Sequence, residues 1–109
     1  MMTRLFTAAI VLIAALGTGA QAQDATLSIS VKDHRFEPAE LTAPANKPIV
    51  LKVKNLDPTP MEFESVTLRV EKVVVGKGEG VIRLRPLSPG RYKFFDDFHQ
   101  DTNGVLVVK

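Results

Sequence analysis

The most informative absence in this sequence is cysteine, which does not occur among its 109 residues. Disulfide bonds are therefore excluded, and the fold must be stabilised by its hydrophobic core alone. A thiolate ligand is excluded as well, so any metal site must be built from imidazole, carboxylate or thioether groups. These two exclusions limit both the architecture and the chemistry of the chain.

Concentrated charge is also missing. Lysine and arginine number 14 against 12 aspartate and glutamate residues, which gives a formal net charge of +2. The sequence has no basic stripe, no interleaving of aromatic and basic residues, and no glycine-rich phosphate loop. Nucleic acids and nucleotides are therefore not expected as partners, because their recognition depends on such features.

The first 22 residues are typical of a secretory signal peptide. A short positive start that includes Arg4 precedes an apolar run over residues 5–16, and Ala20-Gln21-Ala22 has the form of a cleavage site. The apolar run is too short to cross a bilayer. We therefore expect cleavage of residues 1–22, a periplasmic location with no membrane span after cleavage, and a single domain over residues 23–109.

After this leader, hydrophobic residues alternate with polar ones in short runs, a pattern typical of strands with one buried face. Pro58 and Pro60 prevent residues 55–60 from continuing a strand, because proline lacks the N–H donor. The expected strands cover residues 27–32, 49–54, 61–65, 68–75, 82–85, 92–96 and 105–108. The pattern predicts an all-β, two-sheet antiparallel sandwich of about seven to eight strands, with Tyr92 and Phe94 in its core.

Several spaced segments occur in an order that resembles the cupredoxin family over essentially the whole domain. They are Val53-Lys54-Asn55-Leu56-Asp57, Pro60-Met61-Glu62-Phe63, Leu87-Ser88-Pro89-Gly90-x-Tyr92-x-Phe94, Asp96-x-x-His99 and Gly104-x-Leu106-x-Val108. The resemblance implies a Greek-key sandwich with a metal site at one pole. It also implies that the end of the first strand, where His34 lies, is near that pole, so that both histidines of the chain meet there.

Within this resemblance the ligand positions have changed. Met61 stands where the family has its first histidine, Asp96 where it has cysteine, and His99 at the second histidine, while the axial methionine has no counterpart. A blue-copper centre is therefore excluded. The candidate metal ligands are the two histidines, three carboxylates and one thioether: His99, Asp96, Met61, Glu62, Asp97 and His34. Glu62, Asp97 and the nearby Glu64 are alternatively exposed charges without a ligand role.

Imidazole and carboxylate ligands suit iron or copper(II). Three segments further resemble the periplasmic cupredoxin-like component of bacterial ferrous-iron transport systems: residues 60–65, 68–73 and 95–99. This resemblance implies an iron or copper ion as ligand, and a periplasmic iron-binding protein and an inner-membrane iron permease as partners. It also implies oxidation of Fe(II), a ferroxidase-like activity for which the sequence assigns no catalytic residue.

Two other hypotheses stay open. The domain is alternatively a non-catalytic binding module that docks to a transporter or partner protein, with any metal incidental. It is alternatively a copper carrier or redox protein. Copper(I) is disfavoured in that case, because Met61 is the only methionine after cleavage and no cysteine is present.

Overall fold

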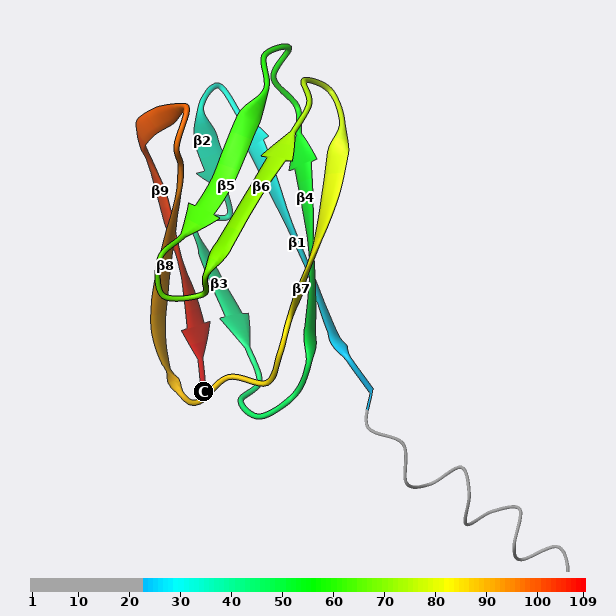
Figure 1. The fold of residues 1–109 in the computed structure, drawn as a ribbon, viewed down its shortest axis with the longest axis vertical. Helices are drawn as coiled ribbons and strands as arrows, with labels where there is room; N and C mark the ends of the chain where they lie inside the picture. Colours follow the sequence, from blue (N-terminus) through cyan, green and yellow to red (C-terminus); the bar gives the residue numbers. More distant parts are fainter. Residues whose placement is uncertain (1–22) are drawn as a thin grey trace, which may run out of the picture.

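The computed structural model describes residues 23–109 and folds them into two packed β-sheets (Figure 1). The leader predicted over residues 1–22 lies outside the described residues. Within residues 23–109, no helix is long and apolar enough to cross a membrane. The prediction of an all-β two-sheet sandwich is confirmed.

Nine strands make up the sandwich. The four-stranded sheet has the order β2-β1-β4-β7, with β1 at Ala25–Lys32, β2 at Arg35–Glu37, β4 at Ile49–Asn55 and β7 at Glu79–Leu84. The five-stranded sheet has the order β3-β9-β8-β5-β6, with β3 at Glu40–Ala43, β5 at Met61–Ser65, β6 at Val70–Val74, β8 at Gly90–Asp96 and β9 at His99–Val108.

The strand directions differ from the prediction in one respect. Both sheets are mixed, because β1 pairs with β4 in parallel and β3 pairs with β9 in parallel. The chain leaves β1, forms β2 and then β3 in the other sheet before it returns as β4, a connection long enough to allow a parallel pair. The expected purely antiparallel arrangement is therefore wrong, since a period of two reports the buried face of a strand and not its direction.

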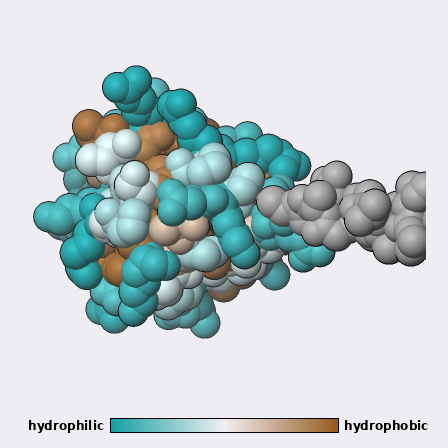
Figure 2. Space-filling view, turned by 90° about the horizontal axis from the view of Figure 1, so that it is seen from below, coloured by the Kyte–Doolittle hydropathy of each residue, from teal (hydrophilic) through white to brown (hydrophobic). Residues whose placement is uncertain are grey.

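The strand boundaries also differ from the prediction. The short strands β2 and β3 lie outside the expected strands, and β9 begins at His99 instead of near Val105. The last strand therefore reaches the pole where the candidate ligands lie. The loops between β4 and β5 and between β8 and β9 meet at this same end of the sandwich, at the top of Figure 1. Figure 2 looks at the opposite end, where hydrophilic surface is interrupted by small hydrophobic areas.

An aromatic cluster anchors the core between the sheets. The rings of Phe63 and Phe94 stack with centroids 4.8 Å apart, and Phe36 meets Phe94 edge-on at 4.9 Å. Such pairs add about 0.5–1.5 kcal/mol each beyond the burial of their surface. Phe94 is buried, as predicted, while Tyr92 is half-buried and donates a hydrogen bond to the Ser88 carbonyl at 2.7 Å.

Strand alternation around this cluster gives β5 and β8 two different faces. On β5 the side chains of Met61, Phe63 and Ser65 are buried, while Glu62 and Glu64 are half-buried on the other face. β8 pairs with β5 through Phe63 and Asp96, so both point inward together. Consecutive residues of these two strands therefore lie in chemically opposite surroundings.

Candidate functional site

The loop between β4 and β5 is closed by the fully buried side chain of Asn55. Its Nδ2 donates to the carbonyl oxygens of Thr59 at 2.8 Å and Val74 at 3.2 Å, and its Oδ1 accepts from the Asp57 N–H at 3.1 Å. These bonds satisfy an amide that would be costly to bury alone. They also fix Asp57 at the pole of the sandwich.

Asp57 in turn holds the β1–β2 turn that carries His34. Its carboxylate accepts the N–H groups of Asp33 at 2.7 Å and His34 at 3.0 Å, and both residues have left-handed backbone angles, with φ of 53° and 57°. The hydrogen bond from the His34 N–H is the main cause that lowers the pKa of Asp57. The Thr102 hydroxyl donates to the His34 carbonyl at 2.6 Å, which ties the turn to β9.

Asp96 lies at the end of β8 with no exposed surface. Its Oδ1 accepts the N–H groups of Glu62 and Phe98, both at 3.0 Å, and its Oδ2 lies 2.8 Å from Nδ1 of His99. The carboxylate is thus satisfied entirely within the protein. A ligand role for Asp96 would require these bonds to break.

The two histidines meet at this pole, as the sequence suggested, and we call them the histidine pair. The His34 and His99 rings stack with centroids 4.0 Å apart and an interplanar angle of 27°. Each ring has its Nδ1 near a carboxylate, at 2.8 Å for His99 to Asp96 and 3.5 Å for His34 to Asp57. The pair lines a surface hollow of about 440 Å³. Within residues 23–109, both carboxylate contacts of the pair are made through Nδ1, and neither is made through Nε2.

Met61 is placed differently from the histidines. Its side chain is 1% exposed and belongs to the hydrophobic core, opposite Val74 of β6. A thioether in this position fills core volume. Met61 therefore lies in the core and does not line the surface hollow of the histidine pair.

A third group lies on the outer face of the five-stranded sheet. Glu62, Glu64 and Asp97 are half-buried, and one ligand oxygen from each lies within 4.8 Å of the others; we call them the acidic cluster. Partial burial first, and then the neighbouring carboxylates, raise the pKa values of Glu62 and Glu64. The Asp97 N–H donates to the Glu62 carbonyl at 2.9 Å, which joins the two strands at this point.

The six predicted ligands are thus divided among three surroundings. Glu62 and Asp97 come together with Glu64, which the sequence left open as an exposed charge. His34 and His99 come together, each against a carboxylate, while Met61 lies in the core. Sequence reasoning missed Asp57, the carboxylate behind His34, although it stands inside a loop motif that the sequence singled out.

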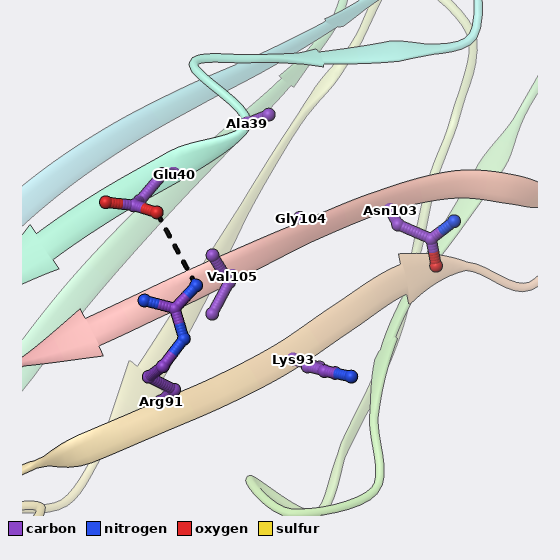
Figure 3. A pocket seen from close by; sticks show the side chains of 7 residues that line it. All are labelled: Ala39, Glu40, Arg91, Lys93, Asn103, Gly104 and Val105. Atoms are coloured by element: carbon purple, nitrogen blue, oxygen red, sulfur yellow. Dashed lines mark ion pairs between the residues drawn. The ribbon is translucent and has the colours of Figure 1, made fainter.

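A second hollow, of about 430 Å³, lies on the outer face of the five-stranded sheet away from these groups. Figure 3 shows Arg91 and Glu40 facing one another across it, with a guanidinium nitrogen 3.6 Å from a carboxylate oxygen. Lys93 and Asn103 lie at its side. None of the predicted ligands lines this hollow.

Several solved structures share the fold. The metal-binding domain of a Cu(I)-exporting P-type ATPase from Streptococcus pneumoniae is similar, with a TM-score of 0.69 at 16% identity, over 83% of this chain and 99% of that domain. Auracyanin A, a "blue" copper protein from Chloroflexus aurantiacus, has a TM-score of 0.67 at 13% identity, over 80% of this chain and all of that one. A purple cupredoxin from Nitrosopumilus maritimus has a TM-score of 0.58 at 19% identity, over 79% and 100%. At these identities the likeness concerns the fold.

The residues of this chain cannot form a blue-copper centre, the type of metal site found in some proteins with this fold. A blue-copper centre needs two histidines and a thiolate. The chain has no cysteine, and the side chain at the thiolate position, Asp96, is buried and accepts hydrogen bonds from its own neighbours. Met61, at the position of one histidine, is buried in the core.

Sequence comparison identifies the family. An uncharacterised protein of Rickettsia prowazekii is 43% identical over 83 residues, which is 75% of this chain and 66% of that protein. The model of the cupredoxin-like domain matches residues 5–108. Together with the sandwich and its structural neighbours, this match establishes that the chain belongs to the cupredoxin-like domain family.

Proposed function

We propose that the domain is a periplasmic metal-binding protein that holds a hard cation, with iron as its cargo, on the acidic cluster. The observation that carries the proposal is the convergence of three carboxylates within 4.8 Å: Glu62, Glu64 and Asp97. Carboxylate oxygens are the preferred ligands of hard cations. In the absence of thiolates, they set the metal preference of the domain.

The electrostatics of the cluster favour a bound cation. Neighbouring carboxylates repel one another, which is part of the reason that the pKa values of Glu62 and Glu64 are raised. Glu71 lies directly across from Glu64 on β6 and adds to this repulsion. A cation would neutralise these charges, and the anionic oxygens would favour Fe(III) over Fe(II).

Partners and location belong to the same proposal. The resemblance to the cupredoxin-like component of ferrous-iron transport supports transfer of the cargo to a second periplasmic iron-binding protein and then to an inner-membrane permease. The leader-like sequence over residues 1–22 supports the periplasmic location. In this scheme the domain is a collecting module that keeps iron bound by oxygen ligands before transport.

Anaerobic calorimetric titration with Fe(II) and Mn(II) tests the proposed site. The double variant E62Q/E64Q removes two ligand charges and should lower the affinity at least about tenfold. The matched control is E37Q/E79Q, the same chemical change on exposed positions of the four-stranded sheet, which should bind as the wild type does. Equal affinity in all three proteins would exclude the acidic cluster as the site.

A second candidate function, binding of copper(II), is favoured by the histidine pair. A carboxylate at Nδ1 of each ring is the usual support for a metal at Nε2, and both His34 and His99 have this arrangement. Titration with Cu(II) should then show weaker binding in H34Q and H99Q but not in E62Q/E64Q. Nitrogen coupling in the electron paramagnetic resonance spectrum should be reduced in each of these two variants, because each keeps only one of the two histidines.

A further inference from the structure

The outer face of the four-stranded sheet carries a concentration of positive charge. Alternate side chains of β1, β2, β4 and β7 point outward from the sheet, and most of them are exposed. The cations among them are Lys32, Arg35, Lys52, Lys54 and Arg83, and the carboxylates are Glu37 and Glu79. We call this surface the basic face.

In the described strand ladders Lys54 stands opposite a carboxylate, Glu79, while the other four cations of the basic face have no carboxylate opposite them. Lys32 stands directly opposite Arg35 in the β1–β2 ladder, and like charges at opposed positions destabilise a sheet. Lys52 and Lys54 project from the same face of β4, which lies between β1 and β7 in the sheet. Within residues 23–109, the three ion pairs involve none of the five cations. A partner outside the described domain would neutralise them.

The outer side of the five-stranded sheet carries a concentration of negative charge, although the cations Arg91 and Lys93 lie on the same side of β8. Glu62, Glu64, Glu71 and Asp97 gather on the outer side of the five-stranded sheet, as described above. The small formal net charge of the chain therefore conceals an uneven distribution of charge between the two outer faces of the sandwich. Packed sheets are about 10 Å apart, so the two charged surfaces lie on opposite sides of a thin layer.

The other side chains of the basic face are better suited to binding a flat polar surface than to binding a protein partner. Between the cations lie the small hydroxyl residues Thr26, Ser28 and Ser30. Among the exposed large hydrophobic residues of the described chain, Val81 is on the strands of this face, and no aromatic residue points outward there. Protein interfaces depend on buried aromatic, methionine and arginine anchors at their centre. The basic face has charge complementarity without such aromatic or methionine anchors.

We propose that the basic face docks on a membrane surface that contains anionic phospholipid headgroups. Basic side chains within a Debye length of such a surface are attracted to it, while the acidic cluster is repelled. The uneven charge thus favours one orientation of the domain, with the basic face on the lipid and the acidic cluster toward the solution. This inference rests on the charges of the strands and is independent of the proposed metal function.

Co-sedimentation of the full chain with vesicles tests the proposal. One set of vesicles contains phosphatidylcholine alone, and the other also contains phosphatidylglycerol. The apolar run over residues 5–16 is present in every sample and contributes to both sets, so the difference between them measures the charge-dependent binding. We expect binding to phosphatidylglycerol vesicles at low ionic strength, with a fall as the salt rises toward about 0.15 M.

Two charge-reversal variants identify the surface responsible. K52E/K54E should lower the partition onto phosphatidylglycerol vesicles at least about tenfold. R91E/K93E makes the same change of charge on the five-stranded sheet and should remain within about twofold of the wild type, because these two residues lie away from the basic face. Its net charge equals that of K52E/K54E, so a difference between the two variants cannot come from net charge alone. All four positions are exposed, and unchanged thermal unfolding confirms that each variant is folded.

Three results would overturn the proposal. The first is equal binding of the wild type to both sets of vesicles. The second is an equal loss in R91E/K93E, which would indicate a dependence on net charge alone. The third is binding to soluble polyglutamate without binding to phosphatidylglycerol vesicles, which would assign the basic face to an acidic protein.

Discussion

Asp96 and Asp97 are adjacent in the chain and lie in opposite surroundings. Asp96 points into the sandwich, where two N–H groups and the His99 ring surround its carboxylate. Asp97 belongs to the acidic cluster, where ligand oxygens of Glu62 and Glu64 lie within 4.8 Å of its own. The first carboxylate stabilises the fold by being fully bonded. The second belongs to a group whose mutual repulsion a bound cation would relieve.

The largest expected effect is on the buried member of this pair. Asp96→Ala leaves three donors without an acceptor and should lower the free energy of unfolding by about 3–5 kcal/mol. Urea denaturation of the metal-free protein measures this loss. Asp96→Asn keeps the oxygen that accepts from Glu62 and Phe98, and should cost clearly less. An equal cost for both variants would contradict the role given to these backbone bonds.

Asp57 extends the comparison to the carboxylate behind His34. Asp57→Ala removes the acceptor of the Asp33 and His34 N–H groups, and we expect a loss of about 1–3 kcal/mol in the free energy of unfolding. The stacked geometry of the histidine pair should be lost with the turn. The histidine ring signals in a nuclear magnetic resonance spectrum report this change, and unchanged signals would show that the turn does not depend on Asp57.

Met61→Leu distinguishes a core residue from a ligand. The replacement conserves volume and apolar character at a position that is 1% exposed, so the free energy of unfolding should change by less than about 1.5 kcal/mol. Affinity for Fe(II) and for Cu(II) should not change in calorimetric titration. A clear loss of affinity for either ion would return the Met61 thioether to the set of ligands.

The smallest expected effect is a dependence of stability on pH, with opposite signs in the two regions. The pKa values of Glu62 and Glu64 are raised on folding, so folding favours their protonated forms. Stability should therefore rise as the pH falls from the raised values toward the ordinary glutamate value. The pKa of Asp57 is lowered, so the stability it contributes is present above the ordinary aspartate value and is lost as the pH falls through the lowered one.

Urea denaturation of the metal-free protein across this pH range tests both signs. The wild type should be most stable at mildly acidic pH. In E62Q/E64Q the rise on acidification should be absent, while the loss at lower pH should remain. A rise that persists in the double variant would have to come from groups other than the acidic cluster.

The alternation of hydrophobic residues was sufficient to predict seven of the nine described strands and their buried faces, but not the short strands β2 and β3. Phe63, Phe94 and Met61 follow this alternation, and all three are buried. Parallel pairing of β1 with β4 was not predictable in this way, because the side-chain pattern is the same for either direction. The pattern also could not show that β9 extends back to His99, since residues 99–104 have few hydrophobic side chains.

The residues of the candidate site could be predicted only in part from the sequence. The family resemblance implied that both histidines meet at one pole, and their rings stack there. It also offered Glu62 and Asp97 as ligands beside them, whereas the structure brings these two together with Glu64 in the acidic cluster. It could not separate the inward Asp96 from the outward Asp97, because the register of β8 against β5 decides which of them is buried. The same register brings Glu64 into the acidic cluster. Glu64 follows Glu62 by two positions on β5, so both side chains lie on the same face of the strand, and this could have been predicted from the sequence.

The histidine pair has a practical consequence for following this protein in solution. The two histidines of the chain are His34 and His99, and their stacked rings place each within the magnetic ring current of the other. The C–H signals of both rings should therefore be displaced together, and should move together whenever the β1–β2 turn shifts against β9. The two histidine rings, one in the β1–β2 turn and one at the start of β9, therefore report changes in the geometry of this pole without an attached label.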